Sequence, residues 1–568
     1  MAAADSNGDA QHPFKGRTLS IINDFDLEEQ WYVYQQTRAL REAVARGEDL
    51  SRFRLMNPES AVYTIFMEDS TRTKESFRNA AEFHRMKVNV FDAKTSSFQK
   101  NETITDTIKM LCGYSIGQSI FVIRSKIEGV CTWLEEAITQ YTSSRGFPRA
   151  SFINAGDGRH EHPSQELLDG FTFLEHKGWD RSHIHLALLG DLFHGRTIHS
   201  KVDGLKIYRA VDVDLVAPGE LALPKHYEDR MRAAGFNVRV FSSIEEYLQQ
   251  PKVAKIWYFT RLQLERMGEK VLDKSVELRK AVTMRREFVE RLPEGTKFFH
   301  PLPRDARHPV LPYWLDNSEL NGWDRQSQNG YFTRITLLGM LSGLLGKDFR
   351  PGPPAALPPA EDFVVEVQCD GAEKKQDTGS VEAGVVPLQN GIVIENLAVG
   401  QSQEQIWGLM YMVRSILGLH GVGGQGVYQP QGGEQPRGFI SVPDFDLSTW
   451  GRQPLKKLAA MAPGSTLKDI QGGVVRREIS FLLPPRIYNF REISCKNEAC
   501  VSHPDNGQRE VVTYFTRVPA GEDKPAGASP VSETSPSWRF SCKYCEAPHN
   551  FWQIWDYKKY YNPSDLVH

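Results

Sequence analysis

The polar segment STRT at 70–73 lies where a strand-like run gives way to a helix-like one. VYTIF at 62–66 predicts a strand, and residues 71–84 predict an amphipathic helix. Free N–H groups at a helix start attract anions, hydroxyls add donors, and Arg72 can bind phosphate oxygens in a fork. An ordinary Ser/Thr N-cap beside a surface arginine is the alternative. The segment therefore indicates a candidate phosphate site.

Four of the seven cysteines form two close pairs near the C-terminus, Cys495-x4-Cys500 and Cys542-x2-Cys545. Four thiolates in this spacing suit a closed, tetrahedral zinc site, which leaves no position for water and is therefore structural. Two disulfides are the alternative, but they suit a secreted protein. We expect one structural zinc ion per chain.

Short apolar runs alternate with amphipathic stretches from about residue 14 to 346. This alternation predicts parallel sheets with helices on both faces, and its length fits two such domains. The proline-rich stretch 350–362 predicts a semi-rigid linker. Beyond it, strand candidates flank one helical run at 404–419, and the segment 519–537, poor in apolar residues, predicts a disordered loop.

Composition excludes some classes of partner. The 568 residues carry 68 basic and 71 acidic side chains, a net charge of −3, which favours neither a nucleic-acid nor a membrane partner. No apolar run approaches membrane-spanning length. The first residues are polar and read as a tail rather than a signal peptide, so we expect a cytoplasmic protein.

The segment FMEDSTRTKESF, which contains STRT, resembles the carbamoyl-phosphate signature of the aspartate and ornithine carbamoyltransferases. Four more segments resemble further signatures of this family, in the family's order: NAGDGRHEHPSQELLDGFT at 154–172, GDLFHGRTIHS at 190–200, YFTRLQLER at 258–266 and HPLPR at 300–304. Five ordered matches make a chance resemblance negligible. The resemblance implies two parallel α/β domains and direct attack of an amine on carbamoyl phosphate, without a covalent intermediate.

The resemblance also implies roles for individual residues. The phosphate would be held by STRT and Arg124, and the carbonyl oxygen would be surrounded by Arg72, Thr73 and His162, the histidine donating a hydrogen bond. The carbamoyl NH₂ would be read by Gln165 and two backbone carbonyls. The implied carbamoyl-phosphate site is Ser70, Thr71, Arg72, Thr73, Arg124, His162, Gln165, Leu302 and Pro303.

The implied amine substrate is L-aspartate, as in pyrimidine biosynthesis. Arg196 and Arg261, supported by Gln263, would bind its two carboxylates, and two separate arginines suit a dicarboxylate. An ornithine site would need an acidic partner, and ornithine enzymes typically carry H-C-L-P where this chain has HPLP at 300–303. Transfer to ornithine or another amine, and an assembly homologue that has lost catalysis, are the alternatives.

The segment KTSSFQKNET at 94–103 resembles a mobile loop that reaches into the neighbouring subunit's site in this family. Ser96 and Lys100 fall at the positions that contact phosphate and aspartate, so a catalytic trimer is expected. Two features depart from the family pattern. Asp69 places a negative charge beside STRT, and Phe98 with Gln99 replaces small or basic residues in the loop.

The segments LPPRIYNFREISCKNEACVSH and CKYCE resemble the zinc domain of the aspartate carbamoyltransferase regulatory chain. This resemblance implies a catalytic chain fused to its regulatory chain, and a hexamer of two trimers joined through the regulatory domains. Residues 388–475 faintly resemble the nucleotide-binding domain. Glu395 and Asn396 would face CTP or ATP, and Lys456 or Lys457 a phosphate, with the arginines at 476–477 nearby. A domain kept only for assembly is the alternative.

The expected fold class is α/β: two doubly wound parallel-sheet catalytic domains, followed by an α+β regulatory domain and a small β-rich zinc domain. The predicted divisions are a disordered tail at 1–13, a carbamoyl-phosphate domain at 14–162 and 325–347, an aspartate domain at 163–324, a proline-rich linker at 348–362, a nucleotide-binding-like regulatory domain at 363–482 and a zinc domain at 483–568.

Overall fold

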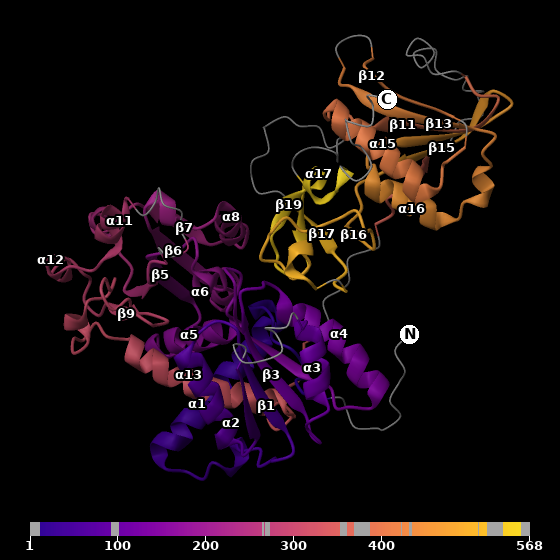
Figure 1. Cartoon of the computed structure of the whole chain (residues 1–568). Coiled ribbons are helices and arrows are strands. Elements are labelled where there is room, and N and C mark those ends of the chain that lie inside the picture. Colours follow the sequence, from indigo (N-terminus) through magenta and orange to yellow (C-terminus); the bar gives the residue numbers. More distant parts are fainter. Residues whose placement is uncertain are drawn as a thin grey trace. The chain divides into compact units, whose positions relative to one another are not determined.

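The computed structural model describes residues 12–92, 102–263, 266, 273–352, 361–367, 387–421, 423–430, 434–508, 510–519 and 538–557. The chain forms two compact units (Figure 1). The first comprises the residues up to 355, with a few from the segment 499–509, and the second comprises most of the remainder. The finer domain boundaries stay predictions, and the predicted loop at 519–537 lies almost wholly outside the described residues.

The first sheet of unit 1 has four parallel strands in the order β2-β1-β3-β4. Its strands are β1 (Ala61–Phe66), β2 (Lys87–Asp92), β3 (Ser119–Ser125) and β4 (Ser151–Asp157). Alternate side chains enter two different cores. Ile120 and Val122 pack with one cluster, whereas Phe121 and Ile123 pack with the other, as the two-residue period of a strand requires. Both faces of this sheet are therefore buried.

The second sheet of unit 1 has five parallel strands in the order β7-β6-β5-β8-β9. Its strands are β5 (His183–Leu189), β6 (Ala210–Val216), β7 (Asn237–Phe241), β8 (Ile256–Phe259) and β9 (Lys297–Phe299). Because every neighbour is parallel, each connection must cross over a face of the sheet. Helices supply most of these crossovers, as the alternating sequence pattern predicts.

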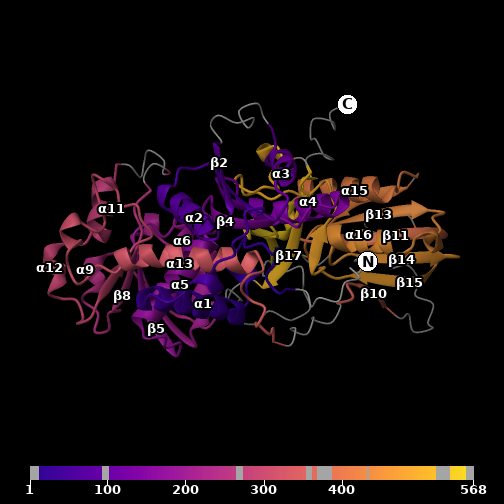
Figure 2. The same cartoon turned by 90° about the horizontal axis from the view of Figure 1, so that it is seen from below.

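Helices cover both sheets. In the described part of unit 1 the α-helices are α1 (Leu27–Arg46), α2 (Thr71–Phe83), α3 (Ile104–Cys112), α4 (Val130–Arg145), α5 (Pro163–His176), α6 (Arg196–His199), α7 (Lys201–Gly204), α8 (Lys225–Ala233), α9 (Ile244–Tyr247), α11 (Ser275–Val282), α12 (Arg286–Val289) and α13 (Trp323–Leu341). Helix α13 packs against α1, α2 and α5 (Figure 2). Helix α13 thereby contacts both α2, which follows β1, and α5, which leads from the first sheet to the second.

Unit 2 contains two antiparallel sheets. The larger has the order β10-β15-β14-β11-β13-β12, and the smaller β16-β17-β18-β19. The larger sheet consists of β10 (Val364–Val367), β11 (Asn390–Leu397), β12 (Gly424–Tyr428), β13 (Arg437–Pro443), β14 (Thr466–Gln471) and β15 (Val474–Phe481), and α15 (Gln403–Leu417) and α16 (Arg452–Met461) accompany it. The smaller consists of β16 (Arg486–Tyr488), β17 (Tyr514–Pro519), β18 (Trp538–Cys542) and β19 (Pro548–Asn550), followed by α17 (Phe551–Ile554). The predicted fold class is confirmed.

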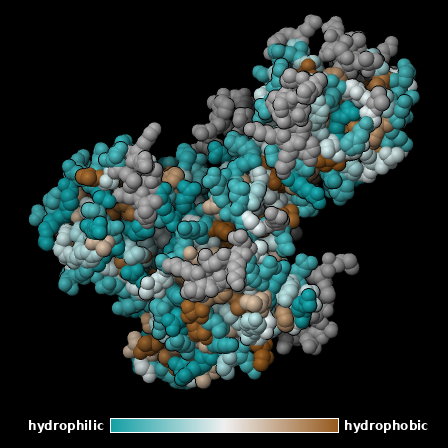
Figure 3. Space-filling view, in the orientation of Figure 1, coloured by the Kyte–Doolittle hydropathy of each residue, from teal (hydrophilic) through white to brown (hydrophobic). Residues whose placement is uncertain are grey.

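The face drawn in Figure 3 is mostly hydrophilic, with hydrophobic side chains scattered over it. Some large apolar residues are exposed, among them Ile116 at 85%. Scattered residues of this kind are normal for a folded protein surface. No described helix is long and apolar enough to cross a membrane.

Candidate active site

A cavity of about 930 Å³ opens in unit 1 at the carboxyl ends of strands from both parallel sheets. This edge is where open parallel sheets commonly bind ligands. The cavity brings together every described residue of the predicted carbamoyl-phosphate and aspartate sites: Ser70, Thr71, Arg72, Thr73, Arg124, His162, Gln165, Arg196, Arg261, Gln263, Leu302 and Pro303. Basic side chains outnumber acidic ones around it, so it suits an anionic ligand.

The segment 70–73 begins α2, as the sequence predicts. Ser70 is the N-cap residue in extended conformation, but its side chain makes no capping hydrogen bond. The alternative of an ordinary N-cap is therefore not what the structure has. The hydroxyl and the first N–H groups of α2 remain at the cavity, where an anion can accept from them. Burial and the nearby Arg304 lower the pKa of Arg72 from its usual value.

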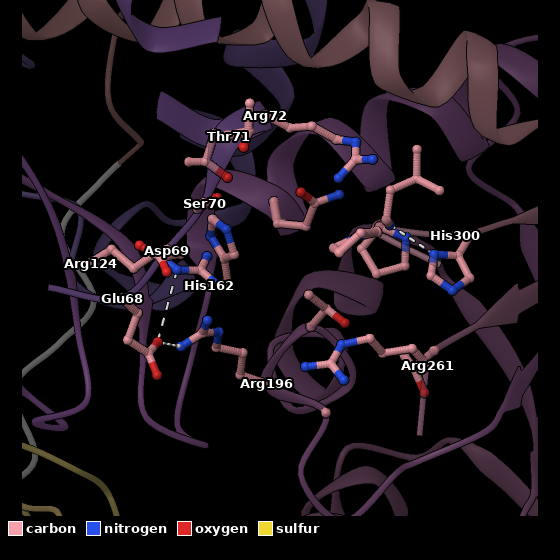
Figure 4. Close-up of a pocket in the computed structure, with 18 of the residues that line it drawn as sticks. Glu68, Asp69, Ser70, Thr71, Arg72, Arg124, His162, Arg196, Arg261 and His300 are labelled. Carbon is pink, nitrogen blue, oxygen red and sulfur yellow. Dashed lines mark hydrogen bonds and ion pairs between the residues drawn. The ribbon is translucent and has the colours of Figure 1, made fainter. Parts of the chain in front are cut away.

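Glu68 lies at the centre of a group of arginines on the floor of the cavity. Its carboxylate is 2.9 Å from Arg196 Nη1 and 3.8 Å from Arg124 Nε (Figure 4). The same carboxylate is 3.2 Å from Arg266 Nη2. Burial and Arg196 lower the pKa of Arg124 to about 9, whereas Glu68 opposes this shift. Glu68 and Arg266 are not among the predicted site residues, although they lie within the motifs at 66–77 and 258–266.

His162 caps the start of α5 and is buried. Its backbone N–H donates to Ser200 Oγ at 2.9 Å, and its ring Nδ1 lies 3.4 Å from Ser164 Oγ. Burial, reinforced by Arg124 and Arg196, lowers its pKa well below 6.5. The imidazole is therefore neutral near pH 7 and can donate one hydrogen bond.

Arg261 follows β8 and reaches into the cavity from the side opposite Arg72 (Figure 4). Gln263 is fixed by two hydrogen bonds: its backbone N–H donates to Asp191 Oδ2 at 3.0 Å, and its Nε2 to the carbonyl of His194 at 3.1 Å. Arg196 Nη1 donates both to Glu68 and to the carbonyl of Gly158 at 3.1 Å. Arg261 Nη1 donates to the carbonyl of Leu262 at 3.3 Å.

The remaining residues singled out in the sequence are the loop at 94–103 and Asp69. Ser96 and Lys100, with Phe98 and Gln99, lie outside the described residues. Asp69 is exposed at the rim of the cavity. Its carboxylate is therefore in a position where water can solvate it, which limits its effect on an anion bound at α2.

The four clustered cysteines are buried, and their sulfur atoms all lie within 4.8 Å of one another. Cys495 and Cys545 are separated by 3.6 Å, close to the ~3.8 Å that 2.3 Å zinc–sulfur bonds give at a tetrahedral metal. None of the four forms a disulfide bond. His549 Nε2 lies 3.3 Å from Cys495 Sγ, where it can support a thiolate. The donor set therefore fits the predicted zinc ion.

Three of the candidate effector residues of unit 2 have partners within the larger sheet. Glu395 on β11 pairs with Lys468 on β14 at 2.6 Å, and Asn396 Oδ1 accepts from Arg437 at 3.0 Å. The predicted arginines 476 and 477 lie on β15, where the second pairs with Glu366 on β10 at 2.8 Å. The predicted lysines at 456–457 are exposed on α16.

Comparison with known families defines the class of this protein. Residues 17–175 match the model of the aspartate/ornithine carbamoyltransferase, carbamoyl-P binding domain. This range contains the segment at 70–73 and the residues at 124, 162 and 165 that line the cavity. The part of unit 1 that contains the first sheet and α5 thus matches the carbamoyl-phosphate domain of this family.

Relatives in the curated collection extend the match to the whole chain. The protein PyrBI of Thermotoga maritima is 47% identical, covering 95% of this chain and 99% of its own, and PyrBI of Treponema denticola is 44% identical, covering 97% and 100%. The aspartate carbamoyltransferase catalytic subunit of Thermococcus kodakarensis is 33% identical over 59% of this chain and 99% of its own. The chain belongs to the aspartate carbamoyltransferases, in the form that fuses catalytic and regulatory parts. The predicted family is confirmed.

Proposed function

We propose that the unit 1 cavity is the site at which the carbamoyl group passes from carbamoyl phosphate to L-aspartate, and that its residues act as follows. The observation that carries the proposal is the convergence of two features in one cationic cavity: the N-terminus of α2, where the Ser70 side chain makes no capping hydrogen bond, and Arg261 on the opposite side. The first suits a phosphate and the second a carboxylate.

The chemistry requires negative charge to be stabilised in two places as the amine attacks. The N–H groups and hydroxyls of 70–73, with Arg124, hold the phosphate that leaves. Arg72, Thr73 and the neutral His162 surround the carbonyl oxygen, where charge develops in the tetrahedral transition state. Gln165 and the backbone carbonyls at 302–303 accept from the carbamoyl NH₂. No side chain needs to act as a nucleophile.

The aspartate carboxylates are bound by Arg261 and Arg196, with Gln263 in support. Arg261 faces the cavity directly, whereas Arg196 must exchange its Glu68 contact for the substrate. Holding the amine beside the carbonyl carbon lowers the barrier by several kcal/mol through alignment alone. Ser96 and Lys100 would complete the site from a neighbouring subunit.

The test is formation of ureido product from carbamoyl phosphate, with L-aspartate and L-ornithine offered in parallel to the full-length protein. Turnover with aspartate alone is expected, because Arg196 and Arg261 can each bind one of its two carboxylates. Turnover with ornithine only, or with neither amine, would contradict the proposed assignment of the cavity.

The neutral state of His162 predicts a simple pH dependence. Since its pKa lies well below 6.5, the ring stays neutral from pH 8 down to pH 6, and kcat/KM for carbamoyl phosphate should show no acidic limb near 6.5 from this group. His162→Asn should lower kcat/KM by about a hundredfold, the usual cost of one such donor, without changing the shape of the profile over this range. A wild-type limb near 6.5 that disappears in the variant would contradict this role.

We propose that Cys495, Cys500, Cys542 and Cys545 bind a structural zinc ion. Four buried sulfur atoms leave no ligand position for water, so the metal would stabilise the small sheet of unit 2 and take no part in carbamoyl transfer. Because such sites rarely form in an unfolded chain, the binding free energy contributes directly to folding.

Cys545→Ser should therefore lose the zinc found by metal analysis and destabilise the C-terminal sheet by several kcal/mol. Limited proteolysis and thermal unfolding measure the second effect. Cys112→Ala is the matched control, since Cys112 is also buried but lies outside the cluster. Equal zinc content in the variant and the control would rule out the assignment.

The catalytic trimer, the hexamer and control by CTP or ATP remain part of the proposal. They are supported by the fused regulatory part of the family. Sedimentation of the full chain, with and without each nucleotide, separates a trimer from a hexamer and detects an effector-linked change. An effector would have to compete with the Glu395–Lys468 ion pair to use either side chain.

A further inference from the structure

A buried cluster of one lysine and two carboxyl groups lies behind the cavity, and burial raises the pKa of one of these groups, Glu166, to about 7. Lys201 Nζ is 2.7 Å from Glu166 Oε2 and 2.7 Å from Asp169 Oδ2, and all three side chains are almost inaccessible to water. The ammonium also lies 4.0 Å from the centre of the Tyr258 ring. Burial alone would lower the pKa of Lys201, but the two carboxylates outweigh it and raise this pKa. The attraction between buried charges seldom offsets the free-energy cost of desolvating them, so stability by itself does not explain this cluster.

Asp169 connects the cluster to the cavity. Its Oδ1 accepts from Gln165 Nε2 at 2.9 Å and from Gln326 Nε2 at 2.7 Å, and both glutamines line the cavity. With Lys201 on the other oxygen, three donors converge on one carboxylate, which can only accept. Each amide must therefore turn its NH₂ to Asp169 and its oxygen away.

The two amide oxygens have different uses. Gln165 Oε1 takes no hydrogen bond from the described part of the chain. Gln326 Oε1 accepts from the backbone N–H of His300 at 2.9 Å, and His300 Nδ1 accepts from that of Leu302 at 2.8 Å. Burial and nearby arginines lower the pKa of His300 to about 3, so Nδ1 remains an acceptor.

The hydrogen bonds from Asp169 through Gln326 and His300 end at Leu302, whose backbone conformation is unfavourable. Leu302 has a φ of 56°, which a residue with a side chain rarely adopts and which the surroundings must impose. The path from Asp169 through Gln326 and His300 supplies this restraint. The two proposed hydrogen-bond acceptors of the carbamoyl NH₂ are the Gln165 oxygen and the backbone carbonyls at 302–303. The positions of both thus depend on the Asp169 carboxylate.

We propose that Asp169, held by Lys201, is a positioning residue that turns both acceptors toward the carbamoyl amino group. The pair would thereby select carbamoyl phosphate over acyl phosphates without an NH₂. This inference rests on the proposed function of the cavity. Glu166 also pairs with Lys201, but it takes part in none of the hydrogen bonds to the two glutamines described above. It packs over Gly204, where a Cβ atom would lie 2.2 Å from Glu166 Oε1.

The experiment compares binding of carbamoyl phosphate with that of acetyl phosphate, which carries a methyl group in place of the NH₂, and of inorganic phosphate. In Asp169→Asn the side chain has one acceptor oxygen in place of two, so it cannot accept both from Lys201 and from the glutamines. The Gln165 amide therefore reverses and places its own NH₂ against the NH₂ of carbamoyl phosphate. We expect the KM for carbamoyl phosphate to rise about 10- to 100-fold, with a lower kcat, the usual cost of a buried polar group left without its partner. The inhibition constants of acetyl phosphate and inorganic phosphate should change by less than about threefold, because the phosphate contacts are intact.

Two more variants make the result decisive. Gln326→Met breaks only the hydrogen bonds that lead to His300. It should also raise the ratio of the KM for carbamoyl phosphate to the inhibition constant of acetyl phosphate, so the test remains possible if Asp169→Asn does not fold. Glu166→Gln is the matched control: it removes a buried carboxylate from the same helix and should leave the ratio unchanged. Equal loss of affinity for all three phosphates would mean that Asp169 is merely structural. Absence of wild-type turnover with aspartate would instead overturn the proposed function.

Discussion

Replacing Arg72 with alanine should lower kcat about a thousandfold, the largest effect expected from a single side chain. Arg72 lies in the first turn of α2 and projects into the cavity, where it would contact both the phosphate and the carbonyl oxygen. Loss of one preorganised donor to a developing oxyanion costs ~100- to 1,000-fold, and Arg72 would also hold the leaving group. Steady-state kinetics with saturating aspartate measures the loss.

Arg78→Ala is the matched control for this variant. Arg78 also lies on α2, but it is partly exposed and pairs with Glu75 at 3.0 Å. An exposed pair three residues apart contributes little to stability, so the control should retain nearly full activity. If Arg72→Ala lost less than tenfold, phosphate binding would have to depend on other groups in the cavity.

Replacing Arg261 with alanine should raise the KM for L-aspartate about a hundredfold and leave the KM for carbamoyl phosphate within a few fold. Its guanidinium faces the cavity opposite the start of α2, so its loss removes a charged hydrogen bond worth about 1.5–3 kcal/mol from one carboxylate. Arg261→Lys should recover only part of the affinity, because an ammonium cannot form the same fork. Initial rates at varied aspartate, with carbamoyl phosphate saturating, measure the change.

Arg209→Ala is the control in the same part of unit 1, since Arg209 is exposed and lies immediately before β6. It should leave both KM values unchanged. Equal rises for both substrates in Arg261→Ala would indicate a general collapse of the cavity and would contradict a specific aspartate clamp. A smaller effect is expected for Arg196, because it already shares its charge with Glu68.

The local elements and the chemistry of the motifs follow from the sequence by itself. The run at 62–66 forms β1, and α2 begins at Thr71, as the change of apolar period predicts. The spacing of Cys495, Cys500, Cys542 and Cys545 also predicts their cluster. The strand, the helix and each cysteine pair are determined by neighbours in the chain, so a short window of residues contains the information that specifies them. The meeting of the two pairs is different, because Cys495 and Cys545 are 50 residues apart.

The tertiary structure alone decided which distant charges meet. Glu68 and Arg196 are 128 residues apart, and Lys201 lies 32 residues beyond Asp169, yet both pairs are in contact in the folded chain. Nothing in the local pattern marks Lys201 as buried, since a lysine on a short helix is usually exposed. Such contacts depend on how two sheets and α13 pack around a shared core, which fixes side-chain positions that periodicity leaves open. The sequence therefore determined which groups are present, and the packing of the two sheets determined which of them act together.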